Sequence, residues 1–139
     1  MKLNWKAIAT GSLIDQGLTS FVSILSTYLL NSWLTFIGTP LNTVSASTYS
    51  ILEPLSFFYG FCFDFLGGYC AVKIAGYKYL QHSYLSSVPV TLLYLASYLN
   101  PISGGSSQML LATLLCPLAF ILGGYEAKNR SSQYPSASA

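Results

Sequence analysis

The sequence predicts an all-α integral membrane protein, a four-helix bundle made of two helix hairpins. Of its 139 residues, 53% are hydrophobic and only 7% are charged, whereas a soluble domain carries about 25% charged residues. Apolar runs of about 20 residues recur along the chain, and that is the length a helix needs to cross a bilayer. Because so few charges cannot cover a surface that faces water, we expect the helices to lie in lipid.

The first predicted helix spans about residues 7–30 and follows two basic residues, Lys2 and Lys6. Asp15 and Gln16 interrupt its apolar run, which is longer than the core of a usual signal peptide. We therefore expect an uncleaved transmembrane helix, with a cleaved signal peptide as the weaker alternative. The polar residues of this helix follow helical spacing and must face other helices or water: Ser12, Gln16, Thr19, Ser23 and Ser26.

Residues 31–38 are predicted to form an interfacial segment on the outer membrane surface, because Trp33 and Phe36 lie within it. The second helix is predicted over about residues 50–76. Ser50 and Glu53 have the spacing of a capping box, with Ser50 as the N-cap. Small residues on one stripe of this helix predict close packing against another backbone: Gly60, Gly67, Ala71 and Ala75.

Two more helices are predicted over about residues 79–99 and 108–125. Each contains a proline near its middle, Pro89 and Pro117, where we expect a kink. Ala119 and Gly123 belong to a small-residue stripe on the fourth helix. Residues 1–126 thus form a single transmembrane domain, and residues 127–139 are predicted to be a flexible cytoplasmic tail, since they are polar and rich in Ser and Ala.

A short motif ends both the second and the fourth helix. Gly67-Gly68-Tyr69-Cys70-Ala71 matches Gly123-Gly124-Tyr125-Glu126-Ala127, which indicates two hairpins related by a parallel duplication. With these GGYxA-type endings the chain resembles small four-helix bacterial inner-membrane proteins of uncharacterised function. The resemblance implies a location in the bacterial inner membrane and implies no activity.

The distribution of basic residues predicts the topology. All Lys and Arg residues flank one side of the four predicted helices, whereas the other two connections carry none. Under the positive-inside rule, both termini and the middle connection lie in the cytoplasm. The basic residues are Lys2, Lys6, Lys73, Lys78, Lys128 and Arg130.

Asp15 and Asp64 are the candidate functional residues. Asp15 lies nine residues after Lys6, and Asp64 lies nine residues before Lys73, so both carboxyl groups should sit about 13 Å from the cytoplasmic side. Two carboxylates in a low dielectric cannot both ionise cheaply, so the pair is a candidate for a proton relay or a cation site. Alternatively, each is a protonated or hydrogen-bonded acid that holds helices together.

Several functional classes find no support in the sequence. The six basic residues are scattered, which argues against nucleic-acid binding. The cysteines, Cys62, Cys70 and Cys116, lie inside apolar runs without metal-ligand spacing, so no metal or cofactor is predicted. No catalytic motif occurs, and an enzyme is unsupported.

Two hypotheses on function remain. The favoured one is an accessory or assembly subunit of a membrane complex, because the fourth helix is almost wholly apolar and offers little to a polar path. The alternative is a proton- or cation-linked transporter or channel subunit that uses Asp15 and Asp64. The expected partners are the lipid bilayer and further copies of the chain or other membrane proteins.

Overall fold

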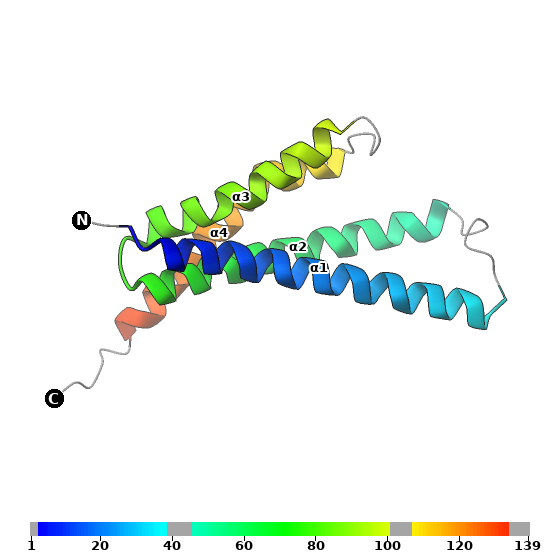
Figure 1. The fold of residues 1–139 in the computed structure, drawn as a ribbon, viewed down its shortest axis with the longest axis horizontal. Helices are drawn as coiled ribbons and strands as arrows, with labels where there is room; N and C mark the ends of the chain where they lie inside the picture. Colours follow the sequence, from blue (N-terminus) through cyan, green and yellow to red (C-terminus); the bar gives the residue numbers. More distant parts are fainter. Residues whose placement is uncertain (1–2, 39–45, 101–106, 134–139) are drawn as a thin grey trace.

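The chain folds into four helices connected in sequence. The computed structural model describes residues 3–38, 46–100 and 107–133, and these contain no strand, which confirms the all-α class. The helices are α1 (Trp5–Phe36), α2 (Ala46–Ala75), α3 (Tyr79–Leu99) and α4 (Ser107–Gln133). They run alternately in opposite directions, so the chain termini and the turn between α2 and α3 lie at one end of the molecule, here called the terminal end (Figure 1).

Helix α1 is longer than the sequence predicted. It continues through residues 31–36 instead of giving way to a separate interfacial segment. No Gly or Pro breaks this stretch, and Thr35 Oγ1 donates a hydrogen bond to the carbonyl of Asn31 at 2.8 Å, as a hydroxyl in a continuing helix does. The helix ends before Gly38, whose φ of 68° lies in the left-handed region.

Helix α2 begins at Ala46, four residues before the predicted start. Ser50 therefore lies inside the helix, and its assignment as the N-cap is wrong. The reason is local, since residues 46–49 contain no helix-breaking Gly or Pro. The side chains of Ser50 and Glu53 lie outside the described part of the structure.

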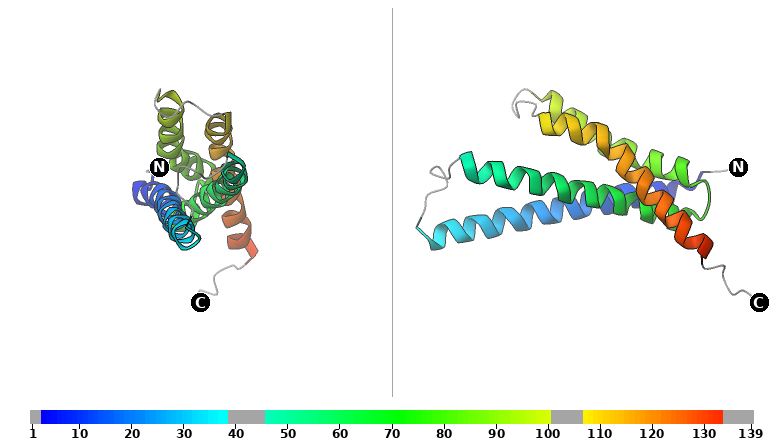
Figure 2. Two further views of the ribbon diagram at one scale, coloured as in Figure 1. Left: turned by 90° about the vertical axis from the view of Figure 1, so that its right-hand side faces the viewer. Right: turned by 180° about the vertical axis from the view of Figure 1, so that it is seen from behind.

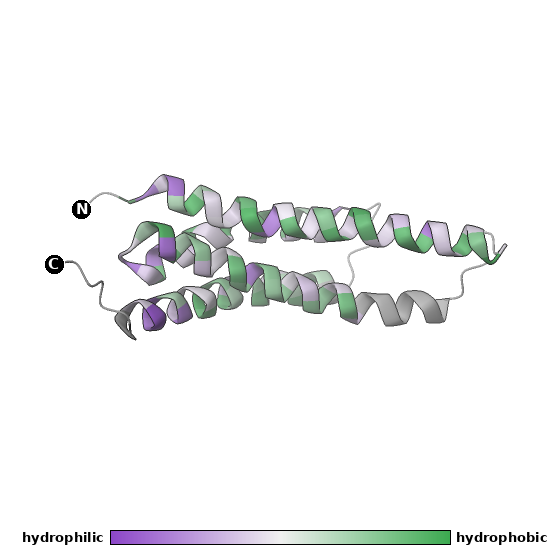
Figure 3. Cartoon of the chain, turned by 90° about the horizontal axis from the view of Figure 1, so that it is seen from below, coloured by the Kyte–Doolittle hydropathy of each residue, from purple (hydrophilic) through white to green (hydrophobic). Residues whose placement is uncertain are grey.

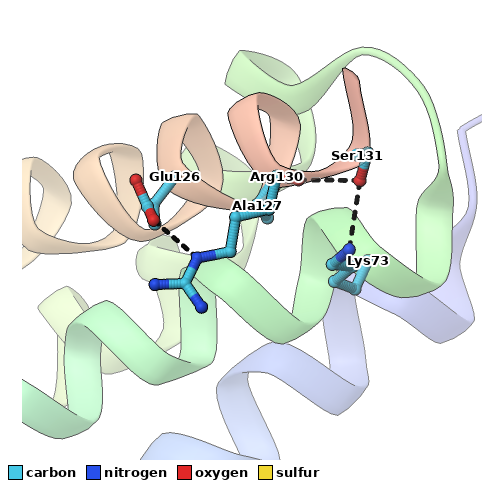
Figure 4. A network of polar contacts seen from close by, with 5 residues as sticks. All are labelled: Lys73, Glu126, Ala127, Arg130 and Ser131. Atoms are coloured by element: carbon cyan, nitrogen blue, oxygen red, sulfur yellow. Dashed lines mark hydrogen bonds and ion pairs between the residues drawn. The ribbon is translucent and has the colours of Figure 1, made fainter. Parts of the chain in front are cut away.

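Helix α4 extends to Gln133, so the predicted tail is wrong for residues 127–133, while residues 134–139 lie outside the described residues. Polar contacts support this last part of the helix (Figure 4). Arg130 Nε donates to Glu126 Oε1 at 2.6 Å, one turn away. Ser131 Oγ donates to the carbonyl of Ala127 at 2.7 Å, and Lys73 Nζ of α2 donates to Ser131 Oγ at 3.2 Å.

The two hairpins pack together at the terminal end and diverge toward the other end, here called the far end. The α1–α2 pair and the α3–α4 pair separate along their length (Figures 1 and 2). The buried residues of α1 follow this shape, because all but Leu34 lie between Ala7 and Asp15. The core of the molecule is therefore in its terminal half, and the hairpins leave a space between them beyond it.

Glycines at the contacts between helices allow the close packing of the terminal half. A Cβ atom at Gly11 of α1 would lie 2.7 Å from the carbonyl oxygen of Gly67 of α2, and one at Gly67 would lie 2.7 Å from the carbonyl oxygen of Gly11. Gly124 of α4 contacts Ser83 of α3 in the same way. The helices are so close at these glycines that a Cβ atom would not fit. The two helices of each hairpin therefore contact each other through backbone atoms or through a small side chain such as that of Ser83.

Three helices are long and apolar enough to cross a membrane: Trp5–Phe36, Pro54–Ala75 and Met109–Ser131. Helix α3 is not among them, since its buried face is mostly polar, with His82, Ser83, Ser86 and Ser87. Hydrophobic residues cover most of the length of the helices, and hydrophilic residues gather toward the terminal end (Figure 3). Many large apolar side chains are exposed, including Ile24 at 72% and Phe36 at 83%.

A buried carboxylate pair at the centre of the bundle

The structure places Asp15 of α1 beside Asp64 of α2. Asp15 follows the contact between Gly11 and Gly67 by four residues, and Asp64 precedes it by three. Because α1 and α2 are antiparallel, one helical turn from that contact leads to the same level on both helices. Both residues are buried, Asp15 completely and Asp64 at 4% exposure, and their carboxyl groups are close enough to influence each other electrostatically.

Side chains from all four helices surround the pair. Gln16 Nε2 donates to Asp15 Oδ2 at 3.1 Å. Cys116 Sγ of α4 donates to Asp64 Oδ1 at 3.4 Å, and Thr91 Oγ1 of α3 donates to Cys116 Sγ at 3.6 Å. The second oxygen of Asp15, Oδ1, is buried and finds no hydrogen-bond partner among the described residues.

Cys116 and Thr91 were missed as site residues from the sequence. Cys116 lies inside an apolar run of the sequence and is fully buried, but it also donates to Asp64. No local signal connects the two, because they lie 52 residues apart on different helices. Thr91 and Tyr94 are one turn apart on the polar side of α3, and this regular spacing was the one available sign that α3 turns polar groups inward.

No cationic side chain in the described ranges pairs with the two carboxyl groups. Among the described residues the one ion pair joins Arg130 and Glu126, which are exposed and close to the terminal end. His82 is fully buried, but its imidazole forms hydrogen bonds with backbone groups near the starts of α1 and α3. The backbone N–H of Asn4 donates to His82 Nε2 at 3.1 Å, which leaves Nδ1 as the donor to the carbonyl of Lys78. Two buried, uncompensated carboxylates cost several kcal/mol each, so the pair requires a proton or a bound cation.

A cavity leads from the space between the hairpins to Asp64. It has a volume of about 330 Å³ and is lined by residues of α1, α2, α3 and α4. A second cavity of about 440 Å³ lies between α1 and α2 toward the far end, and it shares Thr19, Ser56 and Gly60 with the first. Thr19 Oγ1, at the junction, has no hydrogen-bond partner among the described residues. Partly open and mostly apolar space therefore extends from the far half of the molecule to Asp64.

The predicted packing residues lie in contacts within the chain. Gly67, Ala71, Ala75, Ala119 and Gly123 are all buried, whereas Gly60 is half-buried, with the Tyr94 hydroxyl 3.7 Å from the position of a Cβ. The small-residue stripes, which were predicted to pack closely against another backbone, are thus covered by the protein's own helices.

The chemistry open to this site is the exchange of small cations. Carboxyl groups hold protons or cations, and the surrounding thiol and hydroxyl groups of Cys116, Thr91 and Tyr94 can only adjust hydrogen bonds to them. Within the described ranges, no group of three or more His, Cys, Asp or Glu side chains could hold a metal ion. Comparisons of the chain with protein-family models, curated proteins and solved structures find no match.

Proposed function

We propose that the protein is a proton- or cation-linked transporter or channel subunit of the bacterial inner membrane, with both termini in the cytoplasm. One observation supports this most. The buried pair of Asp15 and Asp64 has no cationic partner within the described part of the chain, and Asp64 lines a cavity. Acidic residues inside a membrane protein are costly and are typical of ion and proton pathways.

The geometry suggests how a proton and a cation would be coupled. A pair of adjacent carboxyl groups that holds one proton has lost one of its two negative charges and attracts a cation less, and a bound cation favours the loss of that proton. The same site then carries one or the other. Exchange of this kind needs access to the pair from each side of the membrane in turn.

The cavity lining extends from Asp64 toward the far end, with residues such as Gly60 and Met109. On the other side of Asp64, Phe120 and the glycine contacts of Gly67, Gly68 and Gly123 fill the terminal half. Access from the terminal end would require the hairpins to move against each other. At Gly68 and Gly123, where the hairpins cross, the two helices meet through backbone atoms. Because no large side chain interlocks the helices at these two glycines, one hairpin can rock on the other.

A flux measurement tests this proposal. The purified protein is reconstituted in liposomes that contain a pH-sensitive dye, and an outward gradient of a small monovalent cation is imposed. We expect proton movement in wild-type vesicles and its loss in Asp15→Asn and Asp64→Asn, since Asn keeps the shape but cannot ionise. Glu126→Gln is the matched control, because Glu126 lies near the terminal end, paired with Arg130. Equal flux in wild type and Asp64→Asn would contradict the proposal.

The far half of α1 supports a second candidate, a subunit that assembles with further copies or with other membrane proteins. Its small polar residues are exposed together with large apolar ones, such as Phe21 at 64% and Tyr28 at 68%. Hydroxyl groups on a membrane helix favour another helix over lipid. The exposed polar residues are Ser20, Ser23, Ser26 and Thr27.

A further inference from the structure

The cavity that ends at Asp64 has an aromatic wall. Phe57 and Phe61 of α2 and Tyr94 of α3 line it, and Met109 of α4 completes the apolar surface. One carboxyl group, that of Asp64, is exposed to this space, and Thr19 adds a hydroxyl whose oxygen has no partner among the described residues. A carboxyl group and aromatic rings in one cavity together favour a positively charged ligand that also has apolar surface.

Aromatic faces attract cations through the ring quadrupole, and the attraction is strongest where water is excluded. They attract quaternary and protonated amines best, since these cations have apolar surfaces that lose little hydration in the pocket. A small metal ion, by contrast, prefers to be surrounded by oxygen ligands, whereas the oxygen-bearing side chains of this lining, Thr19, Ser56, Asp64 and Tyr94, are outnumbered by apolar ones. A neutral apolar molecule would fit the wall and leave the acidic pair uncompensated.

We infer that this cavity binds a small organic ammonium cation, whose charge is neutralised by Asp64 and Asp15 and whose apolar groups contact Phe57, Phe61 and Tyr94. The inference rests on the proposed function and names its substrate class. The size of the cavity, about 330 Å³, limits the ligand to a compact amine. The orphan Oδ1 of Asp15, which is completely buried beside Asp64, is the independent sign that the site lacks a positive partner.

Binding is coupled to proton release. The titratable groups that face Asp64 are Asp15 from α1, Tyr94 from α3 and Cys116 from α4, and no Lys, Arg or His from the described residues joins them. Charge balance is kept when the ammonium ion enters and the proton shared by the two carboxyl groups leaves to solvent. No covalent bond other than that O–H bond breaks.

Choline and 3,3-dimethylbutan-1-ol are the probes that test this. They have the same shape, and the first carries a positive nitrogen where the second has a neutral carbon. Isothermal titration of the detergent-solubilised protein in weak buffer measures binding, and a pH electrode measures proton release. We expect choline to bind and release about one proton, with a Kd that rises by up to about tenfold for each unit by which the pH falls. The neutral alcohol should not bind measurably.

Two variants assign the site. Asp64→Asn should abolish choline binding and proton release. Phe61→Leu should retain the proton but weaken choline binding by about tenfold, since it removes one aromatic face. Phe58→Leu is its matched control, because Phe58 is 61% exposed and does not line the cavity. Thermal unfolding of each variant shows whether it is folded, and any variant that unfolds is replaced by Phe61→Met or Asp64→Ser, which also remove the aromatic ring or the charge.

The outcomes separate this inference from the proposed function. If choline fails to bind a folded wild type whose proton flux depends on Asp64, the organic-cation site is wrong and the proton-linked function stands. Equal binding of choline and the neutral alcohol overturns the inference as well, since the cavity would then be only apolar. Choline binding that is lost in Asp64→Asn, without proton flux in any condition, supports the site and overturns transport.

Discussion

Gly68 of α2 and Gly123 of α4 occupy equivalent positions where the two hairpins cross. A Cβ atom at Gly68 would lie 2.6 Å from the carbonyl carbon of Phe120, and one at Gly123 would lie 2.8 Å from the carbonyl carbon of Phe65. Phe65 precedes Gly68 by three residues, and Phe120 precedes Gly123 by three. In each Gly-Gly pair, one glycine thus contacts the other hairpin. Its neighbour, Gly67 or Gly124, contacts a helix of its own hairpin and also a side chain of the other hairpin, Phe120 or Val72.

Because the hairpins are so close at this crossing, adding one methyl group to either glycine should destabilise the protein. Gly68→Ala and Gly123→Ala should each lower the free energy of unfolding by about 1–3 kcal/mol, because the new atom meets backbone atoms that cannot rotate away. Gly17→Ala is the control, since nothing lies within 4 Å of its added Cβ, and it should be neutral or slightly stabilising. Thermal unfolding in detergent, followed by circular dichroism, measures the difference. Unchanged melting of both crossing variants would contradict the crossing.

The contact between α1 and α3 depends on one serine. Ser12 Oγ is buried and lies 2.6 Å from the carbonyl of Ser86 and 3.2 Å from that of Ile8. Ser12→Ala should cost about 1 kcal/mol of unfolding free energy, the typical net contribution of such a hydrogen bond. Thr27→Ala, whose hydroxyl bonds within α1 at an exposed position, should have a smaller effect. Equal melting shifts in the two variants would argue against a specific role of Ser12.

Disulfide crosslinking in membranes tests the assembly candidate. In a background in which Cys62, Cys70 and Cys116 are replaced by Ala, Ser20→Cys on the exposed half of α1 should form covalent dimers if that face meets a second copy. Leu92→Cys on α3, which is 58% exposed, is the control and should crosslink less. If oxidation yields no dimer at Ser20, that face does not meet a second copy.

The basic residues predict the orientation of the chain. A reporter fused after Gln133 that is active only in the periplasm should remain silent, and the same reporter fused within the connection between α1 and α2 should be active. Cytoplasmic reporters at the two positions should give the opposite pattern and serve as controls. If the reporter fused after Gln133 is active and the other is silent, the topology inferred from Lys and Arg is inverted.

The pattern of hydrophobic residues along the sequence was enough to predict part of the fold. The four helices follow from apolar runs, and the matching level of Asp15 and Asp64 follows from their equal distances to Lys6 and Lys73. The extensions of α1 to Phe36 and of α4 to Gln133 were missed, because polar residues continue these helices through contacts one turn apart.

The other misses concern contacts between distant parts of the chain. Periodicity identifies small residues that pack closely, but not whether the partner is in the same chain, and the glycine contacts turned out to be internal. The divergence of the hairpins and the proximity of Cys116 to Asp64 arise only when all four helices pack together, so no local pattern in the sequence indicates them.

The last prediction concerns the proton of the carboxylate pair. If Asp15 and Asp64 share one proton, infrared spectra of the wild type should retain a protonated carboxyl band at neutral pH, although an ordinary Asp in water loses its proton near about pH 4. Asp64→Asn should remove or shift this band, because the remaining carboxyl group no longer has a charged neighbour with which to share a proton. Glu126→Gln should leave the band unchanged, since Glu126 pairs with Arg130 away from the cavity. A wild-type spectrum without any protonated carboxyl band at neutral pH would mean that both acids are ionised and separately solvated, and the paired-carboxylate site would have to be abandoned.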